Sequence, residues 1–271
     1  MSLIVSMTTI ASRLDLCRQT CHALGRQDLQ PDRIILNVSS TPYLLDAGIA
    51  DRTLLEWAGE VRGLEVAWVQ NTGPYRKLLP TLAQVQCGDI VVTADDDVLY
   101  GPSWLHLLAD CAQSHPDAVV CGRARRPGRN LLGRDRGYWS WPLAQVETLA
   151  AGLVPVGLAG VVYRPELLDL EWLTDANFND IAPTTDDLWF AEAIRRKGTR
   201  VMVAPGIEPQ IHPIAHSSTL FDINGGGARA WGSFAARMTR RLKSRLGIPC
   251  CVNDINYRAI RTYSLETGNP G

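Results

Sequence analysis

Short apolar runs alternate with longer amphipathic segments through the first half of the chain. Runs with the length and β-branched content of strands lie at residues 3–7, 33–38, 64–69, 90–92 and 118–121. Segments with helical spacing lie between them, at residues 12–27, 78–86 and 102–114. In the first segment Ser12 is a candidate cap, and the apolar stripe is Leu14, Cys17, Cys21 and Leu24. This alternation predicts an α/β fold whose mostly parallel central sheet carries helices on both faces.

The fourth apolar run ends in three consecutive carboxylates, Asp95, Asp96 and Asp97. Adjacent carboxylates repel one another, and a hard divalent cation is the natural compensation because it prefers carboxylate oxygens. In an extended backbone Asp95 and Asp97 would point to one side, so that two carboxylates converge on one ion or ligand. Open α/β sheets bind ligands at the carboxyl ends of their strands, where this run lies. The alternative interpretation is a solvated acidic turn.

Polar residues also follow the other predicted strands. They are Thr8 and Thr9, then Ser39 and Ser40, then the loop 71–77 with Arg76 and Lys77. Because the carboxyl ends of parallel strands share one edge of a sheet, we expect these residues near the Asp run. Loops are usually polar, so chance can produce the same pattern.

The second half of the chain is less regular. Six arginines between residues 122 and 137 suit either phosphate binding or a solvated loop. Three aromatic residues within 138–142 suit stacking on a sugar or base, although buried packing is their commoner use. Gly157 and Gly160 lie where a backbone can approach a ligand or another strand. Thr185 is a candidate cap for a helix to about residue 197, with Asp186 and Asp187 in its first turn; capping alone could explain these two carboxylates.

A late strand at residues 199–204 precedes His212, His216 and a run of glycines at 225–227 that predicts a hinge. Residues 228–246 then predict an amphipathic helix with Trp231, Phe234, Met238 and Leu242 on its apolar side. Its polar side is basic. Such a helix can lie on an anionic membrane surface, or it can dock on its own domain with its charges in water, and the second interpretation is slightly favoured.

Composition narrows the function. The chain has 271 residues, is 46% hydrophobic and carries a net charge of −1, which fits one large or two small globular domains and argues against a general nucleic-acid binder. We expect neither a signal peptide nor a membrane-spanning segment. Seven cysteines without Cys-x-x-Cys spacing favour a reducing, cytoplasmic setting.

Three segments together resemble the GT-A glycosyltransferases, and in particular a bacterial family-2-like branch associated with surface polysaccharide assembly. They are Gly73-Pro74-Tyr75-Arg76-Lys77-Leu78, the stretch from Val92 to Tyr100 with the Asp run, and Thr185-Asp186-Asp187-Leu188-Trp189-Phe190. The resemblance spans roughly residues 3–216. It implies a Rossmann-like GT-A fold with an irregular acceptor-side half and a C-terminal helix. A glycosyltransferase domain is then expected at 1–222, divided at about residue 122 into nucleotide-binding and acceptor halves, with hinge, helix and tail at 223–271.

The resemblance implies a hexosyltransferase-type enzyme that uses Mn²⁺ or Mg²⁺ and a nucleotide-diphosphate sugar, with a UDP-sugar favoured. The acceptor would be a hydroxyl of a saccharide or lipid-linked saccharide. When the family's motif is matched to this sequence, Asp97 and Asp95 would hold the metal, with His216 preferred over His212 as a nitrogen ligand. The donor would be bound by Thr8, Thr9, Arg13, Ser39, Lys77, Asp95 and Asp96. Independently of the resemblance, the basic amphipathic pattern of residues 228–246 would allow peripheral contact with the inner face of a membrane.

An inverting transferase also needs a base that removes the proton of the acceptor hydroxyl. The resemblance gives this role to a carboxylate at the start of the later helix, and Asp187 is preferred to Asp186. A carboxylate at a helix amino terminus is a weak base unless it is desolvated. Trp139, Trp141, Gly157 and Gly160 would shape the sugar and acceptor site.

Other functions compete with this one. An aspartyl-type phosphatase would use Asp95 and Asp97, but the motif then lies on the fourth strand instead of the first, and Leu99 replaces the expected Thr or Val. A nucleotidyltransferase would need a Gly-rich phosphate loop near the first strand, which the sequence lacks. A non-catalytic sugar-binding scaffold could use the same groove.

Overall fold

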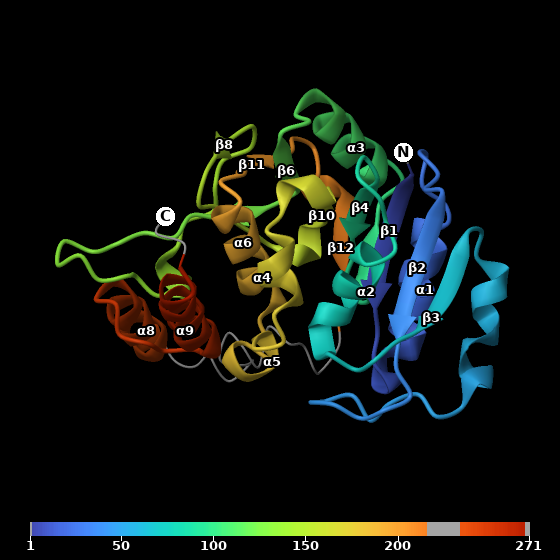
Figure 1. Cartoon of the computed structure of the whole chain (residues 1–271), viewed down its shortest axis with the longest axis horizontal. Coiled ribbons are helices and arrows are strands. Elements are labelled where there is room, and N and C mark those ends of the chain that lie inside the picture. Colours follow the sequence, from blue (N-terminus) through green and yellow to red (C-terminus); the bar gives the residue numbers. More distant parts are fainter. Residues whose placement is uncertain (1, 216–233, 269–271) are drawn as a thin grey trace.

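The computed structural model describes residues 2–215 and 234–268 of the chain (Figure 1). In this part, the centre of the molecule is an eight-stranded sheet in the order β3-β2-β1-β4-β10-β6-β11-β8. Its strands are β1 (Leu3–Thr8), β2 (Arg33–Val38), β3 (Leu64–Trp68), β4 (Ile90–Thr93), β6 (Ala118–Cys121), β8 (Leu149–Ala150), β10 (Val161–Tyr163) and β11 (Arg200–Val203). Two small pairs lie beside it, β5 (Val98–Tyr100) with β12 (Ile211–Pro213) and β7 (Ala124–Arg125) with β9 (Val154–Pro155).

The sheet is mixed. Strand β1 pairs in parallel with β2 and β4, β2 pairs in parallel with β3, and β6 pairs in parallel with β11. Strand β10, from the second half of the sequence, lies antiparallel between β4 and β6, with Val162 opposite Val92. The two halves therefore share one continuous sheet.

Helices cover both faces of the sheet. The main ones are α1 (Leu14–Leu24), α2 (Leu79–Leu82), α3 (Trp104–Ser114), α4 (Leu170–Thr174), α5 (Phe178–Ile181), α6 (Asp186–Arg196), α8 (Phe234–Arg245) and α9 (Val252–Glu266). Side chains alternate along β4: Val92 packs in one buried cluster with α1 and α3, and Val91 packs in another with α4 and α6. This confirms the predicted α/β class, and the arrangement is consistent with the Rossmann-like GT-A fold.

The C-terminal helices lie at the end of the molecule opposite β3 (Figure 1). Helix α9 packs on α6, where the buried Glu192 accepts hydrogen bonds from Arg195 at 2.7 Å and Arg261 at 3.3 Å. The buried Asp254 at the start of α9 accepts from the backbone N–H of Tyr138 at 2.6 Å. These contacts join α9 to the second half of the sheet. No helix in the part described has the length and apolar character needed to span a bilayer.

Several local predictions were wrong. The helix expected at 78–86 is shorter than predicted: α2 covers only Leu79–Leu82 and follows a 3₁₀ segment, η3 (Gly73–Lys77). Neither expected cap forms: Ser12 lies in a 3₁₀ turn before α1, and Thr185 precedes α6 without a capping bond, because its hydroxyl accepts from Asn256 at 3.0 Å. Helix α8 confirms the end of the helix expected at 228–246. Residues 228–233 and the glycine hinge lie outside the described residues.

Candidate active site

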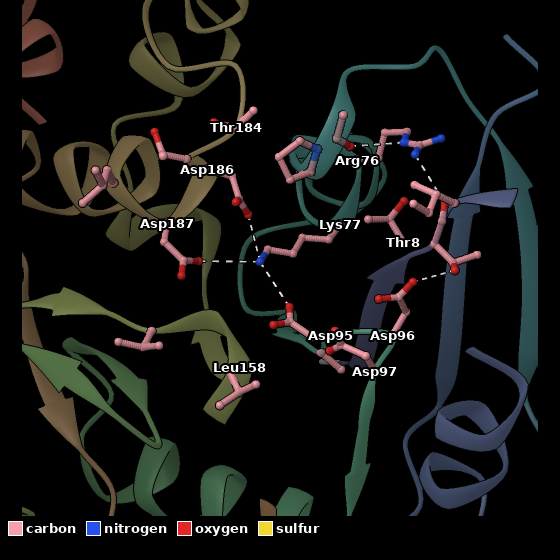
Figure 2. A pocket seen from close by; sticks show the side chains of 18 of the residues that line it. Thr8, Arg76, Lys77, Asp95, Asp96, Asp97, Leu158, Thr184, Asp186 and Asp187 are labelled. Atoms are coloured by element: carbon pink, nitrogen blue, oxygen red, sulfur yellow. Dashed lines mark hydrogen bonds and ion pairs between the residues drawn. The ribbon is translucent and has the colours of Figure 1, made fainter. Parts of the chain in front are cut away.

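A cavity of about 520 Å³ opens at the carboxyl ends of β1 and β4. Both halves of the chain contribute to its wall. It includes most of the residues that the sequence singled out, namely Thr8, Thr9, Arg13, Lys77, Asp95, Asp96, Asp97, Asp186 and Asp187. Figure 2 shows Asp95, from the turn after β4, and Asp186 and Asp187, from the start of α6, converging on Lys77.

Lys77 stands at the centre of the site. Its Nζ lies 2.8 Å from Asp186, 3.3 Å from Asp95 and 3.6 Å from Asp187 (Figure 2). Only 9% of the Lys77 side chain is exposed. Burial alone would lower the pKa of Lys77, but the charges of Asp186, Asp95 and Asp187 outweigh it and hold the pKa well above its ordinary value. A permanent cation therefore joins the acidic turn to helix α6.

The elements that carry these charges are held in place by buried contacts. The Ser6 hydroxyl donates to the Lys77 carbonyl at 2.6 Å, which fixes η3 to β1. On the other side, the indole rings of Trp172 and Trp189 stack at 4.2 Å, and each indole N–H donates to the backbone carbonyl of the other residue at 3.2 Å. This reciprocal pair locks α6 against α4, so Asp186 and Asp187 reach the cavity from a rigid helix.

Asp187 combines access with desolvation. A third of its side chain is exposed, and its Oδ2 accepts a hydrogen bond from the Gly157 N–H at 2.9 Å. Burial raises the pKa of Asp187 to about 6, against the opposing charge of Lys77, and the charges of Asp186 and Asp95 add to the increase. The predicted weakness of a carboxylate at a helix amino terminus is thus offset by desolvation in the protein itself.

Gly157 leaves the space that this arrangement needs. A β-carbon at Gly157 would lie 2.8 Å from both Asp187 Oδ1 and Lys77 Nζ. Gly160, the other glycine of this loop, has a different role. Its φ is +87°, and a β-carbon there would lie 2.5 Å from the Trp104 ring, so it permits packing in the core.

The acidic run lies in a turn and not in an extended strand, so the expected alternation of its side chains was wrong. Asp96 is buried, accepting from the Thr9 hydroxyl at 2.6 Å and pairing with Arg13 at 3.2 Å. Asp97 lies 3.6 Å from the same guanidinium, whereas Asp95 turns toward Lys77. Burial raises the pKa of Asp96 to about 6, although Arg13 and Thr9 oppose the shift.

Sequence reasoning missed a buried ion pair in the cavity wall. Arg76 Nη2 lies 2.9 Å from Asp46 Oδ2, and both side chains are almost fully buried. The same Arg76 nitrogen donates to the Thr9 carbonyl at 3.3 Å. Arg76 Nη1 is buried and makes no hydrogen bond to a described residue. Asp46 lies in an irregular loop without periodic signal, so nothing in the sequence marked it.

Segments remote in the sequence also contribute to the wall. Arg123 and Arg125 come from the arginine-rich loop, for which the sequence left phosphate binding open, and Tyr138 follows that loop. Asn253 comes from the first turn of α9, which the sequence did not connect with the site. The Arg125 guanidinium lies 4.7 Å from the centre of the Tyr138 ring. The C-terminal helices thus contribute to the same cavity as the Asp run.

Other predicted residues lie away from the wall. Ser39 is buried and its hydroxyl pairs with Thr41 at 3.1 Å. Trp141 is 3% exposed, donates its indole N–H to the Arg136 carbonyl and packs on Tyr257, and Trp139 is half-buried; neither is among the described residues that line the cavity. Their contacts with a ligand stay predictions.

The metal ligands also stay predictions. His212 is exposed on β12, opposite Leu99 of β5, and His216 lies outside the described residues. Within residues 2–215 and 234–268, no group of three or more His, Cys, Asp or Glu side chains is arranged to hold a metal ion. Among the carboxylates that line the cavity, Asp95 and Asp97 of the acidic turn each have a cationic neighbour, Lys77 and Arg13 respectively.

Comparisons with known proteins give only weak likenesses. No family model and no curated protein matches the chain. Among solved structures, S. aureus TarS 1-349 matches with 17% identity over 74% of this chain and 60% of its own, at a TM-score of 0.43. The same protein in complex with UDP-GlcNAc matches with 16% identity over 81% of this chain and 60% of its own, at 0.48. A 4-diphosphocytidyl-2C-methyl-D-erythritol synthase matches with 10% identity over 80% of this chain and 94% of its own, at 0.47.

The chain thus spans 43 to 60% of the length of the TarS chains that it matches. At these identities and scores, the likenesses do not bear on the chemistry of the site.

Proposed function

We propose that this protein is a glycosyltransferase that moves a sugar from a nucleotide-diphosphate donor, favoured to be a UDP-sugar, to a hydroxyl of a saccharide or lipid-linked saccharide. One observation carries the proposal. Asp187, an accessible carboxylate with a pKa of about 6, shares Lys77 with Asp95 of the acidic turn. The proposed base and the acidic turn, which would lie beside the donor phosphates, therefore line one cavity of about 520 Å³. This volume is typical of small-molecule sites.

The proposed reaction is inverting. The acceptor oxygen forms a bond to the anomeric carbon while the bond from that carbon to the phosphate oxygen breaks. The proton of the acceptor hydroxyl passes to a carboxylate oxygen of Asp187, and the electron pair of the broken bond leaves with the nucleoside diphosphate. A pKa near 6 suits this base, since it is mostly ionised at neutral pH yet more basic than an ordinary carboxylate.

The donor would lie over the acidic turn. Thr9 and Arg13 hold Asp96, and the adjacent Arg76 has a buried N–H group that makes no hydrogen bond to a described residue. A buried donor without a partner costs free energy, and a carbonyl or phosphate oxygen of a ligand would satisfy it. Lys77 would approach the phosphates as the central cation.

The acidic turn fits a divalent ion by the chemistry of its donors. Asp95 and Asp97 offer carboxylate oxygens at the cavity, which are the ligands that Mg²⁺ and Mn²⁺ prefer. When bound there, such an ion would act as a Lewis acid that neutralises the charge growing on the departing phosphate. Lys77 and Arg13, which contact these carboxylates, would then turn toward the phosphates.

The test compares donor binding with transfer. Uridine diphosphate sugars with Mn²⁺ should raise the thermal unfolding midpoint of the protein. Asp187→Asn should preserve this shift but lower the transfer rate by about 10²–10⁴-fold, because the variant cannot accept the proton. In the wild type, the rate should rise with pH through an apparent pKa near 6, because the base must be ionised, and the variant should lack this limb.

Near-normal transfer by Asp187→Asn would remove Asp187 from the role of base. The absence of stabilisation by uridine, guanosine and cytidine diphosphates would count against the whole proposal. If the protein instead hydrolyses simple phosphate esters and loses this activity in Asp95→Asn, the phosphatase interpretation holds. Binding of a nucleotide sugar with neither transfer nor hydrolysis would favour the non-catalytic scaffold.

A further inference from the structure

The arginine-rich loop forms a hairpin that projects from the molecule. Its strands are joined by backbone hydrogen bonds from Asn130 to Arg134 at 2.8 Å and from Arg136 to Gly128 at 2.8 Å. Two leucines occupy the tip, and both are exposed: Leu131 to 104% and Leu132 to 74%. Exposed leucines at a hairpin tip add no hydrophobic stabilisation to the fold. Apolar side chains exposed in this way mark a site of contact with another surface.

Helix α8 presents the same chemistry. Met238, Leu242 and Leu246 follow one another at intervals of four residues, and all three are about half exposed. The opposite side of the helix faces the protein, where Ser244 is fully buried. Of the apolar side that the sequence predicted, Met238 and Leu242 are among the described side chains, and both point away from the protein core.

The hairpin and the helix are neighbours. The Gly137 N–H, at the base of the hairpin, donates to the Ser244 carbonyl at 2.8 Å. Gly247, just beyond α8, approaches so closely that a β-carbon there would lie 2.6 Å from the Asp135 carbonyl oxygen. Figure 1 shows the hairpin reaching out from the end of the molecule where α8 and α9 lie. Both apolar groups therefore belong to one end of the protein.

The charges at this end are almost all positive. Residues 123–136 contain six arginines and one acidic residue, and no Asp or Glu occurs between Asp222 and Asp254. Arg126, Arg129, Arg134 and Arg136 on the hairpin and Arg241, Lys243 and Arg245 on α8 are exposed. The whole chain carries a net charge of −1, so this basic end is a local feature.

We propose that the hairpin tip and α8 form a membrane-docking surface, in which the leucines and Met238 enter the interface of an anionic lipid bilayer and the basic residues bind its phosphates. Apolar side chains flanked by Lys and Arg are the composition of helices that lie in such interfaces. A surface for a second copy of this chain would need acidic groups opposite the arginines, and the described residues of the hairpin and α8 include one acidic side chain, Asp135, which lies 3.3 Å from Arg129. Docking does not depend on the reaction proposed above.

The test measures partition of the full chain onto lipid vesicles by co-sedimentation. We expect binding to vesicles containing phosphatidylglycerol and much weaker binding to phosphatidylcholine alone. The variant Leu131→Ser/Leu132→Ser should lower the partition coefficient by at least about tenfold, because the inserted apolar area is lost. Arg134→Ala and Arg241→Ala should each lower it roughly fivefold. Leu54→Ser is the matched control, since Leu54 is 50% exposed in η2 (Arg52–Glu60), beside β3 at the opposite end of the sheet.

Every substituted residue is exposed, so the variants should keep the wild-type circular dichroism spectrum and unfolding midpoint. Equal binding to neutral and anionic vesicles, or an equal loss in Leu54→Ser, would overturn the proposal. So would a dimer in sedimentation velocity that the tip variant dissociates while wild-type protein ignores vesicles. Vesicle binding is read without donor or acceptor, so its failure leaves the glycosyltransferase proposal standing, and loss of transfer in Asp187→Asn leaves docking untouched.

Discussion

The cavity and the basic end of the molecule use the same kinds of charged residues in opposite ways. In the cavity, the Lys77 side chain is 9% exposed and faces three carboxylates. At the basic end, Arg129 is 70% exposed and faces Asp135 at 3.3 Å. A buried charge depends on its partners because water cannot replace them, whereas an exposed charge is solvated with or without a partner. The stability of the cavity therefore depends on the position of each charged side chain. At the basic end, the total positive charge is more important than any single pair.

Among the substitutions that test this contrast, Lys77→Met is expected to have the largest effect on stability. The substitution leaves the buried Asp186 and the nearby Asp95 without their cation, and we expect a loss of about 3–5 kcal/mol in unfolding free energy at neutral pH. Urea denaturation measures it. Lys197→Met, on an exposed lysine after α6, is the control and should change little. Equal effects of the two variants would show that the carboxylates do not depend on Lys77.

Gly157→Ala probes the same cavity through its shape. The added methyl group would lie 2.8 Å from Asp187 Oδ1 and Lys77 Nζ, so at least one of these two side chains must shift. We expect a loss of about 1–3 kcal/mol in unfolding free energy and a fall in transfer rate. The matched substitution Gly59→Ala meets no atom within 4 Å and should preserve both. Unchanged transfer in Gly157→Ala would mean that the geometry of the pair is not critical.

The smallest effect is expected at the basic end. Arg129→Ala removes the exposed pair with Asp135, and the unfolding free energy should change by less than about 0.5 kcal/mol. The same urea titration measures this change. A loss close to that of Lys77→Met would contradict the contrast between the two regions.

Part of this site was predictable from sequence because its signals are local. The apolar run of β4 and the carboxylates after it are adjacent in the chain, and Thr9 and Lys77 follow strands that share one sheet edge. Asp46 was not predictable, since its burial depends on Arg76, 30 residues away, and on a loop without periodicity. The expected cap at Thr185 failed because its hydroxyl accepts a hydrogen bond from Asn256, a partner from α9.

The sequence by itself determined the layered α/β class, the strand that ends in the acidic run, and the amphipathic character of α8, because these follow from the spacing of apolar and polar residues along a short stretch. Only the tertiary structure decided that β10 separates β4 from β6, that Lys77 binds carboxylates from both halves, and that Met238 and Leu242 of α8 point outward. The physical reason is that a side chain is buried by groups that are far apart in the chain and come together only in the folded protein. The pKa of about 6 at Asp187 depends on this burial.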